Sequence, residues 1–491
     1  MTAPRHVHHA RERRWVTLAS IVVVIAAVAV ASRSPGSSAP GGPPVSSTAL
    51  VSPPKVESSA WYCVGPSTVS GGVAQGSIVL TNTGPAAVSA LLTAVTDTGS
   101  KVSTTATVPP RSQIVAPVPA PSSGKWMATS VVLSGGGVAV SQSVHGLSGW
   151  SEAPCVSTTS QDWYYPSGTT SGSADLYTEL LNPSSSPVVV DVSFVTPAGV
   201  VHPINFQGLV LQPDQLQVQD VSAYVQNQAH VSTTVSARTG RIVAAELQVI
   251  PGPPAGLALV TGAPVPSSTW AIPEALELSG GSTSIDVYNP GSTTESVTVR
   301  AALGSGPVSP FHMRLLPESS WQLVTSSQTR IPSGDTYAAT VQADGGPGVV
   351  VGRPVTAPSG ASQPQFGLAM GVDALSASAP SDEWVVPSPG TSASPAVSGV
   401  LPAHLGLSDT GRRAVHYAVD VLLPAGDHMI ASGTVGPGHF VSLGDSVLFP
   451  AGLNPLVVRT SGPVALSEDV GPAGTLGVIT MPGIPLAVAD S

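Results

Sequence analysis

The stretch Ser284-Ile-Asp-Val-Tyr-Asn-Pro-Gly-Ser-Thr-Thr-Glu-Ser-Val-Thr-Val-Arg300 shows the pattern on which the chain is built. Ile285 and Val287 alternate with polar neighbours, as in a half-buried strand. The Asn-Pro-Gly that follows is a turn signal, and a second alternating run comes after it. The same strand and turn recur at Leu80-Thr-Asn-Thr-Gly84 and Leu181-Asn-Pro-Ser184, and in a weaker form at Leu407-Ser-Asp-Thr-Gly411.

Three further markers accompany each copy of this pattern. A Trp opens each copy, at Trp61, Trp163, Trp270 and Trp384, so the steps between copies are 102, 107 and 114 residues. Each copy also has a Pro turn and, near its end, a short apolar strand. We therefore define four repeats: repeat 1 (61–160), repeat 2 (161–267), repeat 3 (268–380) and repeat 4 (381–491). We expect the large Trp ring to plug the end of each sandwich as a core residue, and exposure for ligand stacking is the alternative.

The sequence predicts an all-β fold. Repeat 1 contains about seven expected strands, with turn signals every 8–12 residues, which is the spacing of a β-sandwich. Those strands lie near 61–65, 77–81, 88–96, 101–108, 113–118, 126–133 and 138–144. We expect four tandem immunoglobulin-like β-sandwich domains. The alternative is a single closed array resembling a β-propeller, although propeller blades usually have only about 40–50 residues.

The N-terminal region predicts a membrane anchor. Residues 1–14 are basic, and residues 15–32 are uncharged and apolar. Eighteen helical residues span about 27 Å, close to the thickness of the hydrocarbon core. Arginines ahead of this segment predict a cytoplasmic N-terminus and an extracellular C-terminal region. The alternative is a signal peptide cleaved near Ala31, because small residues alternate there. Residues 33–60 are rich in Ser, Pro and Gly and read as a disordered linker.

Composition and charge exclude some classes of function. Charged residues make up 9% of the chain, against roughly 25% in ordinary domains. After residue 32 there are 14 Lys and Arg against 27 Asp and Glu, with no basic stripe, so nucleic acid is not an expected partner. The chain has two cysteines, Cys63 and Cys155, and in an exported protein such a pair predicts one disulfide.

Motifs for catalysis, metal binding or cofactor binding do not emerge. There is no Gly-x-Ser-x-Gly elbow, no His-Glu-x-x-His and no zinc-type Cys/His spacing. Glu277, Asp286 and Glu295 were considered as a carboxylate pair for glycoside hydrolysis, but solvated charges on strand faces explain them better. The cluster Trp163-Tyr164-Tyr165 suits stacking on a sugar ring, but core and inter-domain packing explains it better.

A resemblance to a known family appears at Trp61-Tyr-Cys63, Ala153-Pro-Cys155 and Trp163-Tyr-Tyr-Pro166, together with the repeated turns. These motifs resemble an actinobacterial family of unknown function, numbered 5719. The resemblance implies a membrane-attached, exported protein of tandem β repeats and implies no activity. The repeats also resemble the immunoglobulin-like adhesion domains of bacterial surface proteins, an analogy of fold alone.

These observations predict a non-enzymatic protein of the cell envelope, held in the cytoplasmic membrane by residues 15–32. It would space or bind envelope components, with envelope polysaccharide or another surface protein as partner. The alternative is a carbohydrate-active or envelope-remodelling enzyme with a site between domains. Two facing carboxylates about 5–10 Å apart in a cleft would favour the enzyme. The sequence does not identify the ligand, the oligomeric state or the biological process.

Overall fold

The computed structural model describes residues 49–53, 55–67, 73–117, 121, 123–252, 255–277, 281–357, 365–373, 382–388, 403–448, 454–470 and 479–487. All of them belong to the second of two compact units, Ser46–Ser491. The predicted basic segment and the predicted membrane-spanning segment 15–32 lie outside the described residues. Among the helices that are described, none has the length and apolar character needed to cross a membrane.

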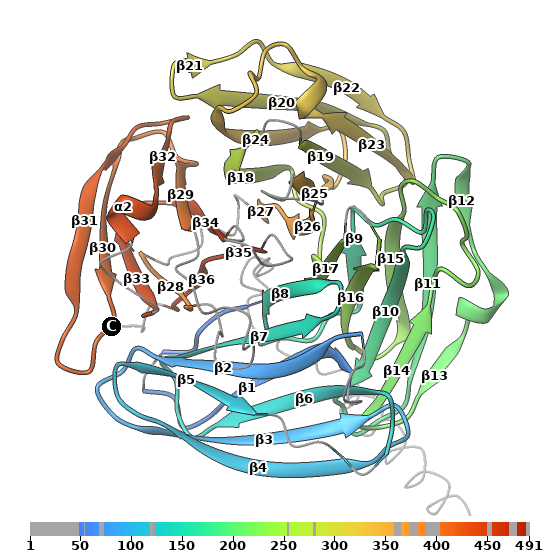
Figure 1. The fold of residues 1–491 in the computed structure, drawn as a ribbon. Helices are drawn as coiled ribbons and strands as arrows, with labels where there is room; N and C mark the ends of the chain where they lie inside the picture. Colours follow the sequence, from blue (N-terminus) through green and yellow to red (C-terminus); the bar gives the residue numbers. More distant parts are fainter. Residues whose placement is uncertain are drawn as a thin grey trace, which may run out of the picture. The chain divides into compact units, whose positions relative to one another are not determined.

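Repeats 1 and 2 consist of strands with one short 3₁₀ helix (Figure 1). The strands of repeat 1 are β1 (Ser59–Ser67), β2 (Gln75–Asn82), β3 (Val88–Thr96), β4 (Lys101–Val108), β5 (Ser112–Pro117), β6 (Trp126–Leu133), β7 (Val138–Gly146) and β8 (Gly149–Pro154). The elements of repeat 2 are β9 (Asp162–Tyr165), β10 (Asp175–Asn182), β11 (Val188–Thr196), β12 (Gly199–Val201), η1 (Ile204–Phe206), β13 (Leu209–Leu211), β14 (Gln215–Asp220), β15 (Ser232–Thr239), β16 (Val243–Ile250) and β17 (Ala255–Val260).

Repeats 3 and 4 are built in the same way. The elements of repeat 3 are β18 (Thr269–Leu276), β19 (Ser282–Asn289), β20 (Glu295–Leu303), β21 (Gly306–Pro307), β22 (Phe311–Leu315), β23 (Ser319–Val324), η2 (Thr325–Ser327), β24 (Thr336–Asp344), β25 (Val350–Ala357), β26 (Gln365–Met370) and β27 (Val372–Asp373). The elements of repeat 4 are β28 (Glu383–Val386), β29 (Ala403–Asp409), β30 (Val415–Val421), β31 (His428–Val435), β32 (Phe440–Leu443), α2 (Asp445–Leu448), β33 (Leu456–Thr460), β34 (Val464–Val470), β35 (Ile479–Pro482) and β36 (Ile484–Pro485).

Each repeat pairs its strands into two sheets in one recurring order. In repeat 1 the sheets are β1-β6-β3-β4 and β5-β2-β7-β8, and the corresponding strands of the other repeats are ordered alike. The pairs are antiparallel, except that β17 and β26 pair in parallel and join repeats 2 and 3 in one eight-stranded sheet. The all-β prediction is confirmed. The immunoglobulin-like part is not, because an immunoglobulin sandwich puts its first, second, fifth and fourth strands in one sheet.

The recurring Asn turn is a hydrogen-bonded clamp. Asn82 Nδ2 donates to the carbonyls of Ala86, Val108 and Pro109 at 2.8–3.2 Å, and the Asn82 Oδ1 accepts from the amide of Gly84. One side chain therefore ties the turn after β2 to the turn between β4 and β5. Asn182 and Asn289 make the same set of bonds in repeats 2 and 3. A buried amide with both ends satisfied explains why the motif recurs.

The two sheets of a repeat enclose a core of Val, Leu, Ile and Ala. The four Trp residues that open the repeats lie in these cores, each at most 3% exposed. Trp163 and Trp270 donate their indole N–H to the carbonyls of Ile242 and Val349. The interpretation of these rings as core residues is confirmed.

The cores continue from one repeat to the next. Val385 and Ile484 of repeat 4 belong to the same hydrophobic cluster as Trp61 of repeat 1, and Val51 exchanges backbone hydrogen bonds with Pro485 and Ala487. Together with the joint between β17 and β26 and the contacts of β18 with β29 and β34, these form a closed circle of contacts through all four repeats. In Figure 1 the blue repeat 1 accordingly lies beside both the green repeat 2 and the red repeat 4. The four domain boundaries stay a prediction, and fragments cut at them would expose apolar surface.

Candidate functional site

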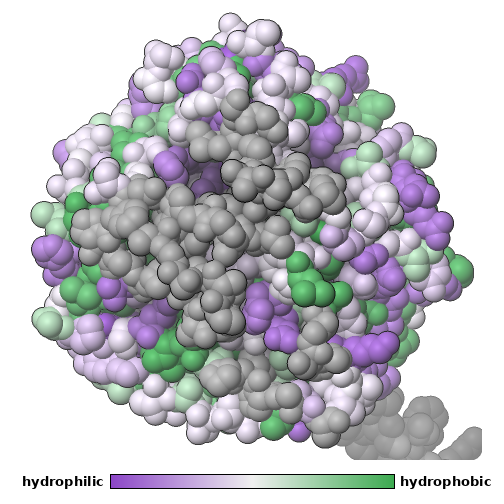
Figure 2. Space-filling view, in the orientation of Figure 1, coloured by the Kyte–Doolittle hydropathy of each residue, from purple (hydrophilic) through white to green (hydrophobic). Residues whose placement is uncertain are grey.

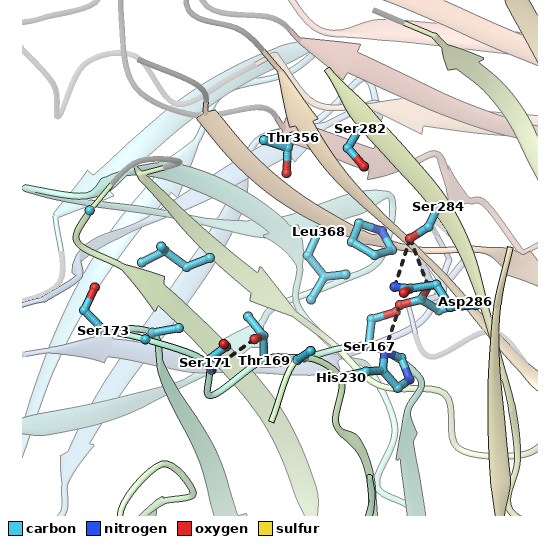
Figure 3. A pocket seen from close by; sticks show the side chains of 18 residues that line it. Ser167, Thr169, Ser171, Ser173, His230, Ser282, Ser284, Asp286, Thr356 and Leu368 are labelled. Carbon is cyan, nitrogen blue, oxygen red and sulfur yellow. Dashed lines mark hydrogen bonds and ion pairs between the residues drawn. The ribbon is translucent and has the colours of Figure 1, made fainter. Parts of the chain in front are cut away.

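A cavity of about 410 Å³ lies between repeats 2 and 3 (Figure 3). Seven of its eighteen lining residues carry a hydroxyl group. Repeat 2 contributes Ser167, Gly168, Thr169, Ser171, Gly172, Ser173, Ala174, Ala229, His230, Ile250 and Gly252, and repeat 3 contributes Ser282, Ser284, Asp286, Gln322, Pro354, Thr356 and Leu368. This volume falls within the roughly 300–1,000 Å³ of sites for small molecules.

Strand alternation positions the polar residues of repeat 3. Ser282, Ser284 and Asp286 are two residues apart on β19, so they line one face of the strand. From repeat 2, the segment after β9 brings Ser167 against β25. Gly352 allows this approach, because a Cβ there would lie 2.6 Å from the Oγ of Ser167.

Asp286 is the centre of the hydrogen bonding in the cavity. Its Oδ1 accepts from Ser284 Oγ at 3.0 Å and from Gln322 Nε2 at 3.1 Å. Its Oδ2 faces His230 Nδ1, 3.4 Å away across the joint between the repeats. Figure 3 shows the carboxylate and the imidazole side by side. Asp286 is fully buried, so these contacts replace the water that an exposed carboxylate would have.

His230 also contacts a serine, but the arrangement is not that of a nucleophile and its base. His230 Nε2 lies 3.2 Å from Ser232 Oγ. The Ser232 hydroxyl donates to the carbonyl of Pro166 at 2.7 Å, so its proton is directed away from the imidazole. Ser232 is also fully buried and is not part of the cavity lining. Since an activated serine must give its proton to the base and reach the substrate, this geometry supports a structural role.

A second cavity, of about 490 Å³, lies between repeats 3 and 4. Its lining includes Asp335, His439 and Ser442, with Asp335 as its single carboxylate among the residues described. The first cavity likewise has the carboxylate of Asp286 alone. Neither has the facing pair that glycoside hydrolysis by two carboxylates requires. Within the described part of the chain, no group of three or more His, Cys, Asp or Glu is placed to hold a metal ion.

The predicted disulfide is confirmed. Cys63 on β1 is bonded to Cys155, which follows β8, and both residues are fully buried. The bond closes the region between the first and last strands of repeat 1. The two residues are 92 apart in the sequence.

The three residues of the predicted stacking cluster point in different directions. Trp163 and Tyr165 lie in the core at 0% and 1% exposed, while Tyr164 is partly buried. Burial, with Glu246 and Glu179 nearby, raises the pKa of the Tyr165 hydroxyl well above its usual range. Of the three rings, only that of Tyr164 has surface that a ligand could reach. Stacking on the cluster stays a prediction limited to that residue.

The cavity residues His230 and Asp286 were not identified as a pair from the sequence. They are in different repeats, and the contact depends on how the two repeats join. Glu277 and Glu295, considered with Asp286, lie in other networks: Glu277 accepts from Thr325, and Glu295 accepts from the amide of Gly348. The run of small hydroxyl residues from Ser167 to Ser173 was the available signal in the sequence.

Comparisons with known proteins support the family resemblance without assigning a function. Residues 122–318 match a family described as a family of unknown function, DUF5719. This match covers the second half of repeat 1, all of repeat 2 and the first half of repeat 3. No curated protein sequence matches the chain.

Three solved structures were compared with the chain. A Thermotoga maritima protein has a TM-score of 0.19 and 18% identity, over 22% of this chain and 93% of its own. A tetra-tandem repeat from the extending region of a large adhesion protein has a TM-score of 0.11 and 12% identity, over 83% and 94%. A 1.5-MDa bacterial ice-binding adhesin has a TM-score of 0.10 and 11% identity, over 72% and 91%. Scores this low carry no argument about fold or function.

Proposed function

We propose that the chain is a non-enzymatic protein of the cell envelope. Residues 15–32 anchor it in the cytoplasmic membrane, and its tandem β repeats lie outside and space or bind envelope components. The observation that carries the proposal is the buried disulfide between Cys63 and Cys155. Such bonds persist in oxidising compartments and are rare in the cytosol of most cells.

The polar residues between the repeats also favour binding over catalysis. The cavity between repeats 2 and 3 has many hydroxyl groups and one carboxylate, which is already held by Ser284, Gln322 and His230. Hydroxyl groups of this kind recognise a polar ligand without activating it. A binding role therefore uses the groups that are present.

Hydrophobic residues on the coloured part of the face in Figure 2 do not gather into one large patch. The strongly hydrophobic residues there are scattered among neutral and hydrophilic ones. The most exposed large apolar side chains are Leu147 at 91% and Ile204 at 82%, in repeats 1 and 2 respectively. Single apolar residues of this kind are ordinary on soluble surfaces.

Export is tested by fusing a reporter that folds only outside the cytoplasm after Ser491. We expect reporter activity, and activity of a cytoplasm-dependent reporter instead would reject the orientation. Cell fractionation separates the two forms of export: the intact chain in the membrane fraction supports the anchor, and a chain beginning near residue 32 in the medium supports cleavage.

The disulfide gives an independent test of compartment. Thiol titration of the protein from its own cells, denatured without reducing agent, should find no free thiol, and a non-reducing gel should show no covalent dimer. Two free thiols per chain would remove the main support for export. In the chain-entropy model a loop of about 90 residues gives roughly 4–5 kcal/mol, so reduction should also lower the melting temperature.

A further inference from the structure

We propose that the cavity between repeats 2 and 3 binds a neutral, hydroxyl-rich ligand about the size of one or two sugar residues. This names a ligand class for the proposed envelope protein and rests on that function. The observations that carry it are the hydroxyl lining, a buried hydroxyl without a partner, the charge of the site and its apolar wall.

The Ser167 side chain is the clearest sign of a built site. Ser167 lines the cavity, is only 3% exposed, and its Oγ has no hydrogen-bond partner. A buried hydroxyl without a partner costs free energy, and rotation about the Ser167 Cα–Cβ bond can turn it toward a ligand hydroxyl in the cavity. Asp286 Oδ2 is likewise fully buried, and its neighbour there is the His230 imidazole at 3.4 Å.

The remaining hydroxyl groups provide both donors and acceptors. Ser171, Ser173 and Ser282 are exposed at the cavity, and each hydroxyl can donate one proton and accept others. Gln322, also exposed, holds Asp286 through its Nε2, which leaves its Oε1 directed elsewhere to accept. A ligand whose own groups both donate and accept, such as a sugar, matches this mixture.

The charge of the cavity disfavours ionic ligands. No Lys or Arg is among its lining residues, and the charged groups are Asp286 and His230. If His230 is protonated the pair is neutral, and if it is not the site carries one negative charge. In neither state does a phosphate, sulfate or carboxylate ligand find a net positive partner. A cation finds one carboxylate whose oxygens already face Ser284, Gln322 and His230.

An apolar wall completes the site. Ile250, Pro354 and Leu368 line the same cavity as the hydroxyl groups. The face of a pyranose ring carries C–H groups, which pack against such side chains while the ring hydroxyls point to Ser and Thr. The combination of an apolar wall with a few placed polar groups is the general form of small-molecule sites.

The test is calorimetric titration with neutral sugars. The full-length chain is used, in a zwitterionic detergent, because a detergent with a sugar head group would compete. The probes are glucose, galactose, mannose, arabinose, maltose and trehalose, with glucuronate and glucosamine as charged analogues of the same size. We expect saturable binding of at least one neutral sugar, at least tenfold tighter than either charged analogue.

Two variants locate the binding. Ser171→Trp places a large ring at the exposed edge of the cavity and should abolish binding, while Ser305→Trp, at the exposed edge of the second cavity, should leave it unchanged. Ser167→Ala removes the unpartnered hydroxyl and should weaken binding about 3- to 10-fold without lowering the melting temperature. Ser388→Ala, at the same offset from the opening Trp in repeat 4, is its matched control.

The proposal is overturned if no neutral sugar gives saturable heat, if glucuronate or glucosamine binds as tightly as the best neutral sugar, or if Ser171→Trp binds normally. These outcomes are separate from those of the export test. A chain that binds sugar in vitro but remains in the cytoplasm would keep the site and reject the envelope function. An exported chain that binds no sugar would keep the envelope function and reject the site.

Discussion

Strands β19 and β29 are the second strands of repeats 3 and 4. Both face the preceding repeat, but they differ in whether space remains at the contact. Three residues before its turn, β19 carries Asp286 and β29 carries Gly406. Each faces the residue four positions after the Trp that opens the preceding repeat, which is Ser167 for β19 and Glu274 for β29. At the first joint the cavity lies beside these residues, and at the second the Glu274 side chain lies directly against the β29 backbone. The second cavity, which also lies between repeats 3 and 4, has neither Glu274 nor Gly406 in its lining.

The difference shows how one backbone arrangement can leave space at this contact or fill it. Where the earlier residue is small, as at Ser167, the later one can be a carboxylate with space in front of it. At the second joint the later residue must be glycine, because a Cβ on Gly406 would lie 2.3 Å from Glu274 Cβ. The closeness of the two backbones at this contact therefore decides whether space remains beside them.

The largest expected effect comes from an ion pair between repeats 3 and 4. Arg353 is 3% exposed and donates to both oxygens of Asp469 at 2.7 and 2.8 Å. Asp469→Asn removes the carboxylate charge that the buried guanidinium bonds through both oxygens, and should destabilise the fold by about 3–5 kcal/mol in chemical denaturation at pH 7. Asp286→Asn at the cavity joint is the matched control and should cost less, since Ser284 and Gln322 remain.

A double variant separates the charge from the packing. Arg353→Met with Asp469→Leu removes both charges and should recover most of the loss, because apolar replacement of a whole buried pair is often neutral or stabilising. If Asp469→Asn alone leaves stability unchanged, the ion pair does not hold repeats 3 and 4 together.

The next effect is a pH dependence due to Glu274. Burial raises the pKa of Glu274 to about 7, with a further upward contribution from Asp469, while the Ser442 hydroxyl and Arg353 act in the opposite direction. His404 Nδ1 also faces its Oε1 at 3.6 Å. The folded state therefore holds a proton that the unfolded state releases near pH 4.5, so stability falls as the pH rises from about 4.5 to 7.

Glu274→Gln should remove this part of the pH profile. The free energy of unfolding that the variant gains over the wild type should be larger at pH 8 than at pH 4. The difference is at most about 3 kcal/mol, since each pKa unit corresponds to about 1.4 kcal/mol. Buried Glu246 and Glu468, each with a pKa raised to about 8, give the wild type a similar trend. The measurement is therefore the difference between the two profiles, and parallel profiles would contradict the prediction.

Adding one methyl group at Gly406 tests the close contact between β29 and Glu274 directly. Gly406→Ala places a Cβ 2.3 Å from Glu274 Cβ and 3.1 Å from its backbone nitrogen, so the joint must open. We expect a loss of about 1–3 kcal/mol, typical of overpacking. Gly304→Ala is the control, because nothing lies within 4 Å of its added Cβ. Pairing Gly406→Ala with Glu274→Gly, which removes the clashing Cβ, should make the loss from Gly406→Ala smaller than in the wild type.

The elements within a repeat could be predicted from the sequence, because local alternation and turn signals specify them. The seven strands expected in repeat 1 correspond within a few residues to β1 through β7. The eighth, Gly149–Pro154, was missed. All six of its residues are buried, so it shows no alternation of apolar and polar positions. A strand that lies between two repeats is buried on both faces, so it lacks the same alternation and is equally hard to predict from the sequence.

The candidate site was beyond the reach of the sequence for a related reason. The Asp286 carboxylate looked like a solvated charge on a strand face, since β19 alternates as a half-exposed strand would. It is buried because repeat 2 covers that face and brings His230 to it. Contacts between repeats depend on the pairing of β17 with β26, and no local sequence pattern predicts that pairing.

The smallest effect concerns the turn at the end of the same two strands. β19 ends in Asn289, and β29 ends in Asp409. Asn289 Nδ2 donates to the carbonyls of Thr293, Leu315 and Leu316. By the same offsets in the sequence, the carbonyls near Asp409 belong to residues 413, 435 and 436, and a carboxylate cannot donate to them. Its Oδ1 still accepts from the amide of Gly411 at 2.7 Å, while its Oδ2 is buried without a hydrogen bond.

Asp409→Asn should therefore stabilise the protein by about 1 kcal/mol at pH 7, since a typical net hydrogen bond contributes roughly 0.5–1.5 kcal/mol. Burial raises the pKa of Asp409, so its neutral form is favoured in the folded state. That form can donate, and its contribution is present below pH 3.8 and lost as the pH rises through the folded pKa. The gain from Asp409→Asn should accordingly shrink toward acid pH, whereas Asn289→Asp should destabilise most at neutral pH. Thermal denaturation of both variants from pH 3 to 8 measures this, and a gain that does not change with pH would show that the missing donor is not the cause.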